Sequence, residues 1–427
     1  MGNARRTAFH HHRRRVKETS AKRFVASTTS NLSQDSTNRR LSEAFSKNLV
    51  DDIYRGSFRN QTGVSLKYMM DFGDHPRDQQ LLFSAQFLHK ELPIRLAHRV
   101  AELENLPFGL STKPQVLTVR DWYVESFEDI REMKEINSME REEKFTELLS
   151  SVMKRHNDVV PMIASGVLEL KNELAGKSKK GGSNNNNNNN NNSNGSSIDA
   201  IAHLPEIHQF LDGFYMSRIG MRMLIGQHVA LHEPPKKDYV GLICTKTKPV
   251  EVCKDAVDDA RALCARQYGE APEVEIFGDP NWTFPYVPGH IHHVVFELVK
   301  NSLRAVVERY KDSDVQPPAI RVVVAEGSED VCIKISDEGG GIPRSGLKKI
   351  WTYLYSTADS PLRDMEFSEA GAGSTPVVLA GYGYGLPLSR LYCRYFGGDL
   401  QVLSMHGYGT DAYVHLNRLG TGTEPLP

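Results

Sequence analysis

Apolar residues recur at three- and four-residue spacing through the first half of the chain, from about Leu41 to Leu231. This spacing is typical of amphipathic helices, and it is clearest in residues 78–107, 142–174 and 205–232. Long amphipathic helices with short connections favour an antiparallel bundle. The pattern therefore predicts a helical domain over residues 41–233.

After Pro234-Pro235 the pattern changes to short apolar runs that alternate with helical segments. We expect helices at 250–268, 292–310 and 386–396. Strands are predicted at 239–246, 273–278, 319–327, 331–339, 399–405 and 411–417. Such alternation indicates a mixed sheet covered by helices, an α/β sandwich over residues 236–419. The fold class predicted for the whole chain is α+β with two domains, the helical bundle first.

Two segments stand outside these domains in composition. Residues 177–197 are rich in Asn, Ser, Gly and Lys, cannot bury apolar surface, and are predicted to form a solvated insert in the bundle. Residues 1–30 hold many Arg and Lys but a single acid, Glu18. Such a leader is typical of a mitochondrial transit peptide, with a disordered basic tail as the alternative.

Composition excludes several classes of protein. The net charge of −1 over 427 residues gives no sign of nucleic-acid binding. No apolar run approaches the roughly 18 residues of a membrane span, so no membrane insertion is expected. The five cysteines are scattered, which argues for a reduced compartment and against a disulfide framework or a zinc site. The 16 histidines are also expected to form no metal centre, because no HExxH or paired spacing is recognised among them.

The helix "HHVVFELVKNSLRAVVERY" (292–310) has an unusual polar face. One side carries a buried-type stripe: Ile291, Val294, Val295, Leu298, Ser302, Ala305 and Val306. The other side gathers five polar residues within an arc of about 100°: His293, Glu297, Lys300, Asn301 and Arg304. A solvated face is the simplest explanation of such a pattern, but the motifs that follow favour a ligand site.

Two glycine clusters come after this helix. Asp337 ends a predicted strand and is followed by Gly339, Gly340 and Gly341, which allow the backbone to approach a ligand closely. "GYGYGLP" (381–387) precedes a helix, where free amides and the positive end of the dipole favour phosphate. Either cluster alone is weak, but in this order after a Glu- and Asn-bearing helix they predict a nucleotide site.

This order resembles the ATP site shared by Hsp90, DNA gyrase, MutL and the histidine kinases. In that superfamily the Asn carries Mg²⁺ and the Asp contacts adenine, which implies these roles for Asn301 and Asp337. The resemblance also implies that residues 350–380, between the two glycine motifs, form a mobile lid.

The quoted helix, "SDEGGGIP", "YSTA" and "GYGYGLPLSRLYCRYFGGDL" resemble the mitochondrial pyruvate dehydrogenase kinases, as do "ELPIRLAHRV", "DWYVESF" and "RHNDVVPMIASGVLELK". The resemblance covers about residues 41–419. It implies Glu297 as general base with His293 beside it, and Asn301 as the Mg²⁺ ligand. It implies a nucleotide site formed by Glu297, Lys300, Asn301, Arg304, Asp337, Ser356, Thr357, Gly381, Tyr382, Gly383, Tyr384, Gly385 and Leu386.

The same resemblance implies a serine kinase that inactivates the pyruvate dehydrogenase complex in the mitochondrial matrix by phosphorylating its E1α subunit. It further implies ATP, Mg²⁺ and K⁺ as ligands, a homodimer, and binding to the lipoyl domain of E2. Animal members carry a long C-terminal tail with an Asp-Trp motif, whereas this sequence ends at "LGTGTEPLP", so the mode of E2 binding stays open. The alternatives are a branched-chain 2-oxoacid dehydrogenase kinase, a protein histidine kinase and a non-catalytic ATP-binding scaffold.

Overall fold

The computed structural model describes residues 40–71, 77–180, 204–355 and 383–426, without the side chains of 175–180. The described residues up to 46 and those from 47 onward belong to separate units. The described part of the first unit contains α2 (Leu41–Ala44), whose start is capped by a hydrogen bond from the Arg40 amide to the Glu43 carboxylate (3.1 Å). The predicted transit peptide and most of the Asn-rich insert lie outside the described residues.

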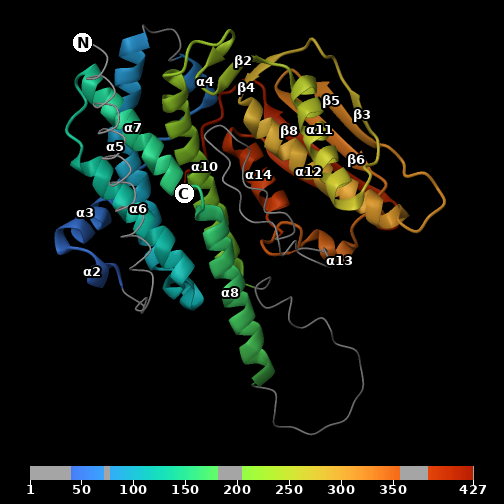
Figure 1. Ribbon diagram of the computed structural model, residues 1–427, viewed down its shortest axis with the longest axis horizontal. Coiled ribbons are helices and arrows are strands. Elements are labelled where there is room, and N and C mark those ends of the chain that lie inside the picture. Colours follow the sequence, from blue (N-terminus) through green and yellow to red (C-terminus); the bar gives the residue numbers. More distant parts are fainter. Residues whose placement is uncertain (1–39, 72–76, 181–203, 356–382, 427) are drawn as a thin grey trace, which may run out of the picture. The chain divides into compact units, whose positions relative to one another are not determined.

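The first half of the larger unit is helical, as predicted from the apolar spacing (Figure 1). α5 packs against α6, and α10 contacts both α5 and α7. Buried leucines of α5 such as Leu88, Leu92 and Leu96 fill these interfaces. The elements are α3 (Lys47–Ser57), α4 (Leu66–Asp71), α5 (Arg77–Glu104), the 3-10 helix η2 (Pro107–Thr112), α6 (Pro114–Glu132), α7 (Met139–Arg155), α8 (Val159–Lys180) and α10 (Pro205–Leu231). None of the helices in the described ranges is long and apolar enough to cross a membrane.

The apolar run at 142–174 contains a break that its spacing does not reveal. α7 ends at Arg155, and His156 leaves the helical conformation at φ −89° and ψ 6°. α8 then starts at Val159 with Pro161 in its first turn, where proline is tolerated because that backbone amide has no helical acceptor. α8 continues to Lys180, so the insert predicted from residue 177 begins within a helix.

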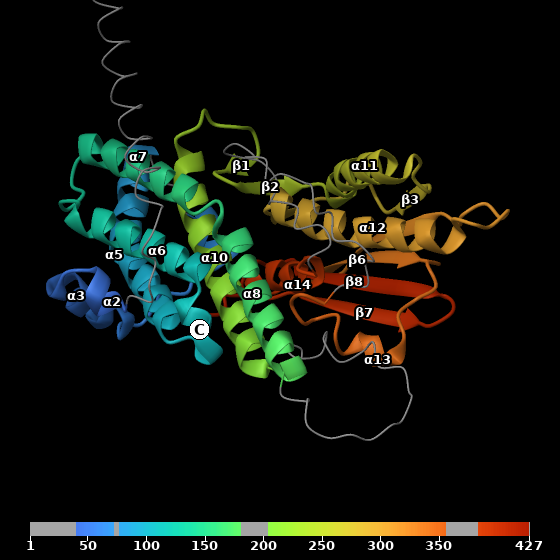
Figure 2. The same cartoon turned by 60° about the horizontal axis from the view of Figure 1, so that its bottom comes forward.

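The second half contains a five-stranded sheet in the order β3-β5-β6-β8-β7. β3 pairs in parallel with β5 and the other neighbours are antiparallel, which confirms the predicted mixed sheet. Figure 2 shows α11 and α12 on the same side of this sheet. The elements are β3 (Val274–Phe277), β5 (Ile320–Glu326), β6 (Asp330–Asp337), β7 (Asp399–Met405), β8 (Gly409–Asn417), α11 (Pro249–Tyr268), α12 (Pro288–Tyr310), α13 (Arg344–Leu347) and α14 (Gly385–Tyr395).

The strand predicted at 239–246 is in fact a hairpin, β1 (Tyr239–Val240) and β2 (Ile243–Thr247). Gly241 turns the chain at φ +59°, and a Cβ there would come within 2.7 Å of the Gln227 amide group. That amide group donates to the Val240 carbonyl (2.9 Å) and accepts from the Leu242 amide (2.8 Å). A third strand, β4 (Phe284–Tyr286), pairs with β2 and was not predicted.

α12 is positioned by the apolar stripe expected for it. Pro288 starts the helix with its φ already suited to the first turn. The predicted stripe is buried except for half-buried Ala305, and Val299 and Leu303 extend it. This face packs on α11, α14 and β6, so the side chains beside the stripe lie at the junction of these three elements.

The C-terminal segment is tied to α5 by a buried ion cluster. Arg95 contacts Glu91 (3.0 Å) and both carboxylate oxygens of Glu424, and all three side chains are at most 4% exposed. The Arg95 guanidinium also donates to the Thr62 carbonyl (2.7 Å). The carboxylates of Glu424 and Glu91 outweigh burial and raise the pKa of Arg95. Arg95 is therefore a permanent buried cation whose neutralisation depends on residue 424.

Replacing Glu424 by alanine should leave this cation short of a partner and lower the free energy of unfolding by roughly 3–5 kcal/mol. Glu140→Ala is the control, because Glu140 pairs with Lys144 at a site where both side chains are more than half exposed. The control should leave stability almost unchanged, because an exposed ion pair contributes little. Urea unfolding followed by circular dichroism measures both, and equal effects would contradict the importance of the buried cluster.

Candidate active site

Glu297 lies on α12 where this helix meets the start of α14. Its side chain is 8% exposed, and its Oε1 is 2.6 Å from the Lys300 ammonium. A Cβ on Gly385, the first residue of α14, would overlap Glu297 Oε2. The glycine therefore lets the positive end of α14 approach the carboxylate, which stabilises its charge. The expected proximity of the second glycine motif and Glu297 is thus present.

Asp337 ends β6 as predicted and is only 8% exposed. The Ser302 hydroxyl donates to its Oδ2 (2.8 Å), and the Gly339 amide donates to its Oδ1 (2.9 Å). Burial raises the pKa of Asp337, while these hydrogen bonds act in the opposite direction. Ser302 was assigned to the apolar stripe by its spacing, and its role as a partner of Asp337 was not predicted.

The first glycine cluster lets the chain pass between α12 and the turn that joins β7 to β8. A Cβ on Gly339 would stand 2.5 Å from the Ala305 Cβ, and one on Gly341 would overlap the Met405 carbonyl. Gly340 and Gly341 also have φ of +91° and +67°, which larger residues rarely adopt. The sterics of this passage therefore require small residues.

Arg309 holds the same loop in place and was not among the predicted site residues. Its guanidinium donates to the carbonyls of Glu338 (2.8 Å), Tyr408 (2.5 Å) and Gly407 (3.1 Å). It thereby links the end of α12 to the glycine loop and to the β7–β8 turn. This contact could not be predicted from the sequence, because Arg309 is an ordinary exposed position on an amphipathic helix.

The second glycine motif is described from Gly383 onward, so Gly381 and Tyr382 lie outside the described residues. The predicted nucleotide contacts Ser356 and Thr357 also lie outside them. Gly383 has φ +75° and passes against the backbone of Tyr355. The Tyr384 ring is fully buried among Tyr215 and Tyr353, so its backbone, rather than its ring, faces any ligand at the start of α14. Half-buried Leu386 follows in the first turn. The side chain of Tyr384, the N-cap residue, does not cap α14, so the first amides of this helix are suited to an anion.

Asn301 and Arg304 behave differently from one another on the polar face of α12. Asn301 is exposed one turn after Glu297, and an amide oxygen beside a carboxylate provides the hard ligands that Mg²⁺ prefers. Arg304 instead pairs with Glu308 on its own helix (2.6 Å). Its predicted contact with phosphates is therefore not preformed, and reaching them would require this ion pair to open.

His293, predicted beside Glu297, is 7% exposed and packs edge-on against the Tyr392 ring, with centroids 4.7 Å apart. Its Nε2 has no hydrogen-bond partner among the described residues. Burial lowers the pKa of His293 to about 4, although the Glu297 carboxylate acts in the opposite direction. The imidazole is therefore neutral at pH 7, and it contributes no positive charge to the site.

The lowered pKa of His293 predicts a pH effect on stability. Between its ordinary pKa of 6.5 and about 4, the unfolded chain binds a proton that the folded chain excludes. His293 should therefore cost up to about 1.4 kcal/mol of stability per pH unit as the pH falls through this window. Denaturant titrations at pH 7 and pH 5 measure how much the free energy of unfolding falls between the two. This fall should be smaller for His293→Gln than for the unchanged protein. An identical fall in both proteins would contradict a neutral, buried His293.

Two family descriptions match the chain. Residues 63–244 match "Mitochondrial branched-chain alpha-ketoacid dehydrogenase kinase", and residues 286–419 match "Histidine kinase-, DNA gyrase B-, and HSP90-like ATPase". The first range covers most of the helical half. The second begins at the end of β4 and contains α12, the glycine loop and α14. The predicted fold class, a helical bundle followed by an α/β ATPase domain, is confirmed.

Curated relatives match nearly the whole chain. A mitochondrial [pyruvate dehydrogenase (acetyl-transferring)] kinase of Arabidopsis thaliana is 57% identical over 390 residues, which are 91% of this chain and 99% of the relative. The corresponding kinase of Schizosaccharomyces pombe is 40% identical, covering 86% of this chain and 95% of its own length. Human isozyme 3 is 38% identical, with coverage of 88% and 87%. The chain therefore belongs to the family of mitochondrial pyruvate dehydrogenase kinases.

Proposed function

We propose that this protein transfers the γ-phosphate of ATP to a serine of the pyruvate dehydrogenase E1α subunit and thereby inactivates the complex. The observation that carries the proposal is the position of Glu297, which lies against the start of α14 and one turn before Asn301 on α12. The chain that holds this arrangement is 57% identical to a mitochondrial [pyruvate dehydrogenase (acetyl-transferring)] kinase. This arrangement supplies a proton acceptor, an anion site and a metal ligand together. A non-catalytic scaffold would need no carboxylate held at that position.

The chemistry of phosphoryl transfer assigns each group a task. Glu297 accepts the proton of the serine hydroxyl as the new bond to phosphorus forms. Lys300, 2.6 Å from Glu297, pairs with this carboxylate and offers positive charge to the phosphates. The amides at the start of α14 bind phosphate oxygens. Neutral His293, one turn before Glu297 on α12, adds no positive charge beside it.

Asn301 would hold Mg²⁺, which neutralises phosphate charge when it is bound. The side chain that would do so is exposed on the same face of α12 as Glu297. Asp337 would accept a hydrogen bond from the exocyclic amine of adenine, since its oxygens keep lone pairs beyond those used by Ser302 and Gly339. Ser356, Thr357, Gly381 and Tyr382 remain proposed nucleotide contacts, and K⁺ a proposed further ligand.

We propose pyruvate dehydrogenase as the substrate because the relatives of Arabidopsis thaliana and Schizosaccharomyces pombe, 57% and 40% identical, carry that name. The branched-chain 2-oxoacid dehydrogenase is the second candidate, because residues 63–244 match the family description of its kinase. Phosphorylation of the two E1 components side by side distinguishes them. We further propose a transit peptide at 1–30, action in the mitochondrial matrix, a homodimer, and docking on the lipoyl domain of E2.

Asp337→Ala should remove the proposed partner of the adenine amine and weaken ATP binding roughly ten- to a hundredfold. The matched control is Glu338→Ala, which removes an acid from the next residue, where the carboxylate contacts the Tyr408 hydroxyl instead (3.3 Å). Calorimetric titration with ATP and Mg²⁺ measures both. Equal affinities in the two variants would reject Asp337 as the adenine contact.

Glu297→Gln keeps the size of the side chain and a hydrogen bond to Lys300 but cannot accept a proton. It should leave ATP affinity within a few-fold and slow phosphate transfer to E1α by roughly 10²–10⁴-fold. Glu140→Gln, at the exposed site on α7, should leave both nearly unchanged. Turnover is measured with γ-labelled ATP at saturation.

Near-normal turnover of Glu297→Gln would mean that Glu297 only positions other groups and that the proton leaves to solvent. The site of the label tests the function itself. Phosphate on a histidine of this chain would favour a histidine kinase, and no transfer to any protein would favour a scaffold.

A further inference from the structure

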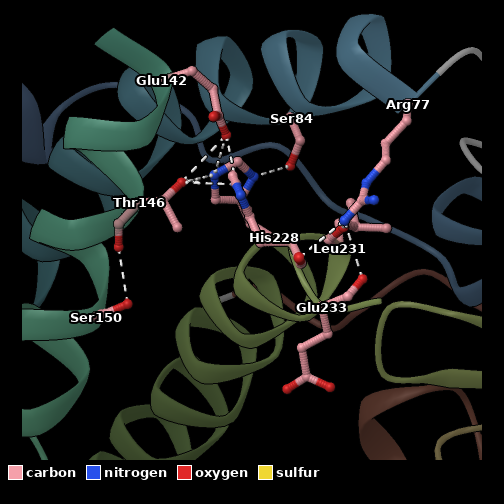
Figure 3. Close-up of polar contacts among 9 residues, drawn as sticks. Arg77, Ser84, Glu142, Thr146, Ser150, His228, Leu231 and Glu233 are labelled. Atoms are coloured by element: carbon pink, nitrogen blue, oxygen red, sulfur yellow. Dashed lines mark hydrogen bonds and ion pairs between the residues drawn. The ribbon is translucent and has the colours of Figure 1, made fainter. Parts of the chain in front are cut away.

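A compact polar cluster lies in the helical half, where α7 meets the end of α10. It consists of Glu142 on α7 and His228 and His232 near the end of α10 (Figure 3). Glu142 and His228 are completely buried, and His232 is 27% exposed. A carboxylate and two imidazoles that face one another inside a helical bundle are ligand types shared by zinc and similar cations.

The ligand atoms of these three residues lie within 4.8 Å of one another. Glu142 Oε1 is 3.2 Å from His228 Nε2 and 2.8 Å from His232 Nε2. The Thr146 hydroxyl lies 3.2 Å from Glu142 Oε1, 2.9 Å from His228 Nε2 and 3.1 Å from His232 Nε2. A tetrahedral zinc site with bonds of about 2.0–2.1 Å has edges of about 3.3 Å. These five separations are therefore close to the edge length that a tetrahedral zinc site requires.

Hydrogen bonding alone leaves this cluster poorly satisfied. Three groups, the two imidazoles and the Thr146 hydroxyl, converge on Oε1 of Glu142. The other oxygen, Oε2, is buried and has no hydrogen-bond partner among the described residues. A buried carboxylate oxygen without a partner is costly. A cation at the centre would bind Oε1 of Glu142 and the Nε2 lone pairs of both histidines. Its positive charge would also attract Oε2 of Glu142.

The surroundings also support the tautomer that metal binding requires. His228 Nδ1 is 2.9 Å from the Ser84 hydroxyl of α5. In the metal-bound form the Nδ1 proton would be donated to Ser84 and Nε2 would bind the cation, which is the usual second contact of a metal-bound histidine.

The backbone that carries His232 is also held in place. His232 is the residue at which α10 ends, and the Arg77 guanidinium of α5 donates to the carbonyls of His232 (2.9 Å) and Glu233 (3.1 Å). Figure 3 shows Arg77 directed at this end of α10, with Ser84 beside His228. The exposed part of His232 provides a route from solvent to an otherwise closed site.

We propose that Glu142, His228 and His232 bind a zinc-class divalent cation that joins α7 to the end of α10. The Thr146 hydroxyl lies beside all three ligand atoms, and Ser84 orients His228 from α5. Such a site connects three helices of the bundle, and its role is to stabilise that region. It is independent of the nucleotide site on α12. The sequence analysis recognised no paired histidine spacing. It missed His228 and His232, which are four residues apart on one helical face.

The test uses the full chain, stripped with a chelator and then titrated with Zn²⁺ and Co²⁺. We expect one equivalent of zinc by elemental analysis after dialysis and a raised thermal midpoint on its addition. With Co²⁺ we expect the intense visible absorption of a tetrahedral centre. Retention of no cation, with no shift of the midpoint, would overturn the proposal and leave a hydrogen-bonded cluster.

Variants locate the site. His232→Gln changes a partly exposed ligand, so the fold should survive, and zinc affinity should fall at least a hundredfold. Ser84→Ala should lower zinc affinity roughly 10–100-fold while leaving the melting of the stripped protein almost unchanged. His406→Gln, at an exposed position in the β7–β8 turn, is the control and should bind zinc normally. Zinc binding that is equal in His232→Gln and the control would place the cation elsewhere and overturn the assignment.

Discussion

Two carboxylates, those of Glu297 and Asp337, are withdrawn from water beside α12, and the candidate site is arranged around the cost of burying them. An ionised carboxylate in a protein interior costs several kcal/mol unless charges or donors compensate. Glu297 has the Lys300 ammonium and the positive end of α14, whereas Asp337 has the Ser302 hydroxyl and the Gly339 and Thr410 amides. The first arrangement places positive charge beside the proposed proton acceptor. The second leaves lone pairs for a ligand that brings its own donor.

A single helix positions both groups. Glu297 and Ser302 are five residues apart on α12, or about 140° around its axis, so one faces α14 and the other the end of β6. The apolar stripe fixes the rotation of α12 on the sheet, and a small turn of the helix would disturb both carboxylates together. Glycines complete the fit where α14 and the first glycine loop approach the helix. The rotation of α12 on the sheet therefore fixes both the packing of the helix and the positions of the site residues. A precise site requires such rigid support.

Periodicity predicted the elements whose own sequence carries the signal, such as α12, β6 and the helical first half. Periodicity did not predict features that depend on contacts with another segment of the chain. The hairpin at Gly241 depends on the side chain of Gln227 from α10, and three-residue β4 is too short to show alternation. Arg309 and Ser302 looked like ordinary helix positions because their partners follow much later in the chain. The glycines and acids of the nucleotide motif were recognisable because their spacing along the chain is itself the signal.

The most direct test of this account is a crystal structure of the protein with a non-hydrolysable ATP analogue and Mg²⁺. The account predicts the adenine amine within hydrogen-bond distance of the Asp337 carboxylate and the metal on the Asn301 amide oxygen. It also predicts phosphate oxygens on the first amides of α14, with the Glu297 carboxylate open towards the position of an incoming hydroxyl. A nucleotide bound away from Asp337, or a Glu297 side chain turned from the γ-phosphate, would contradict it.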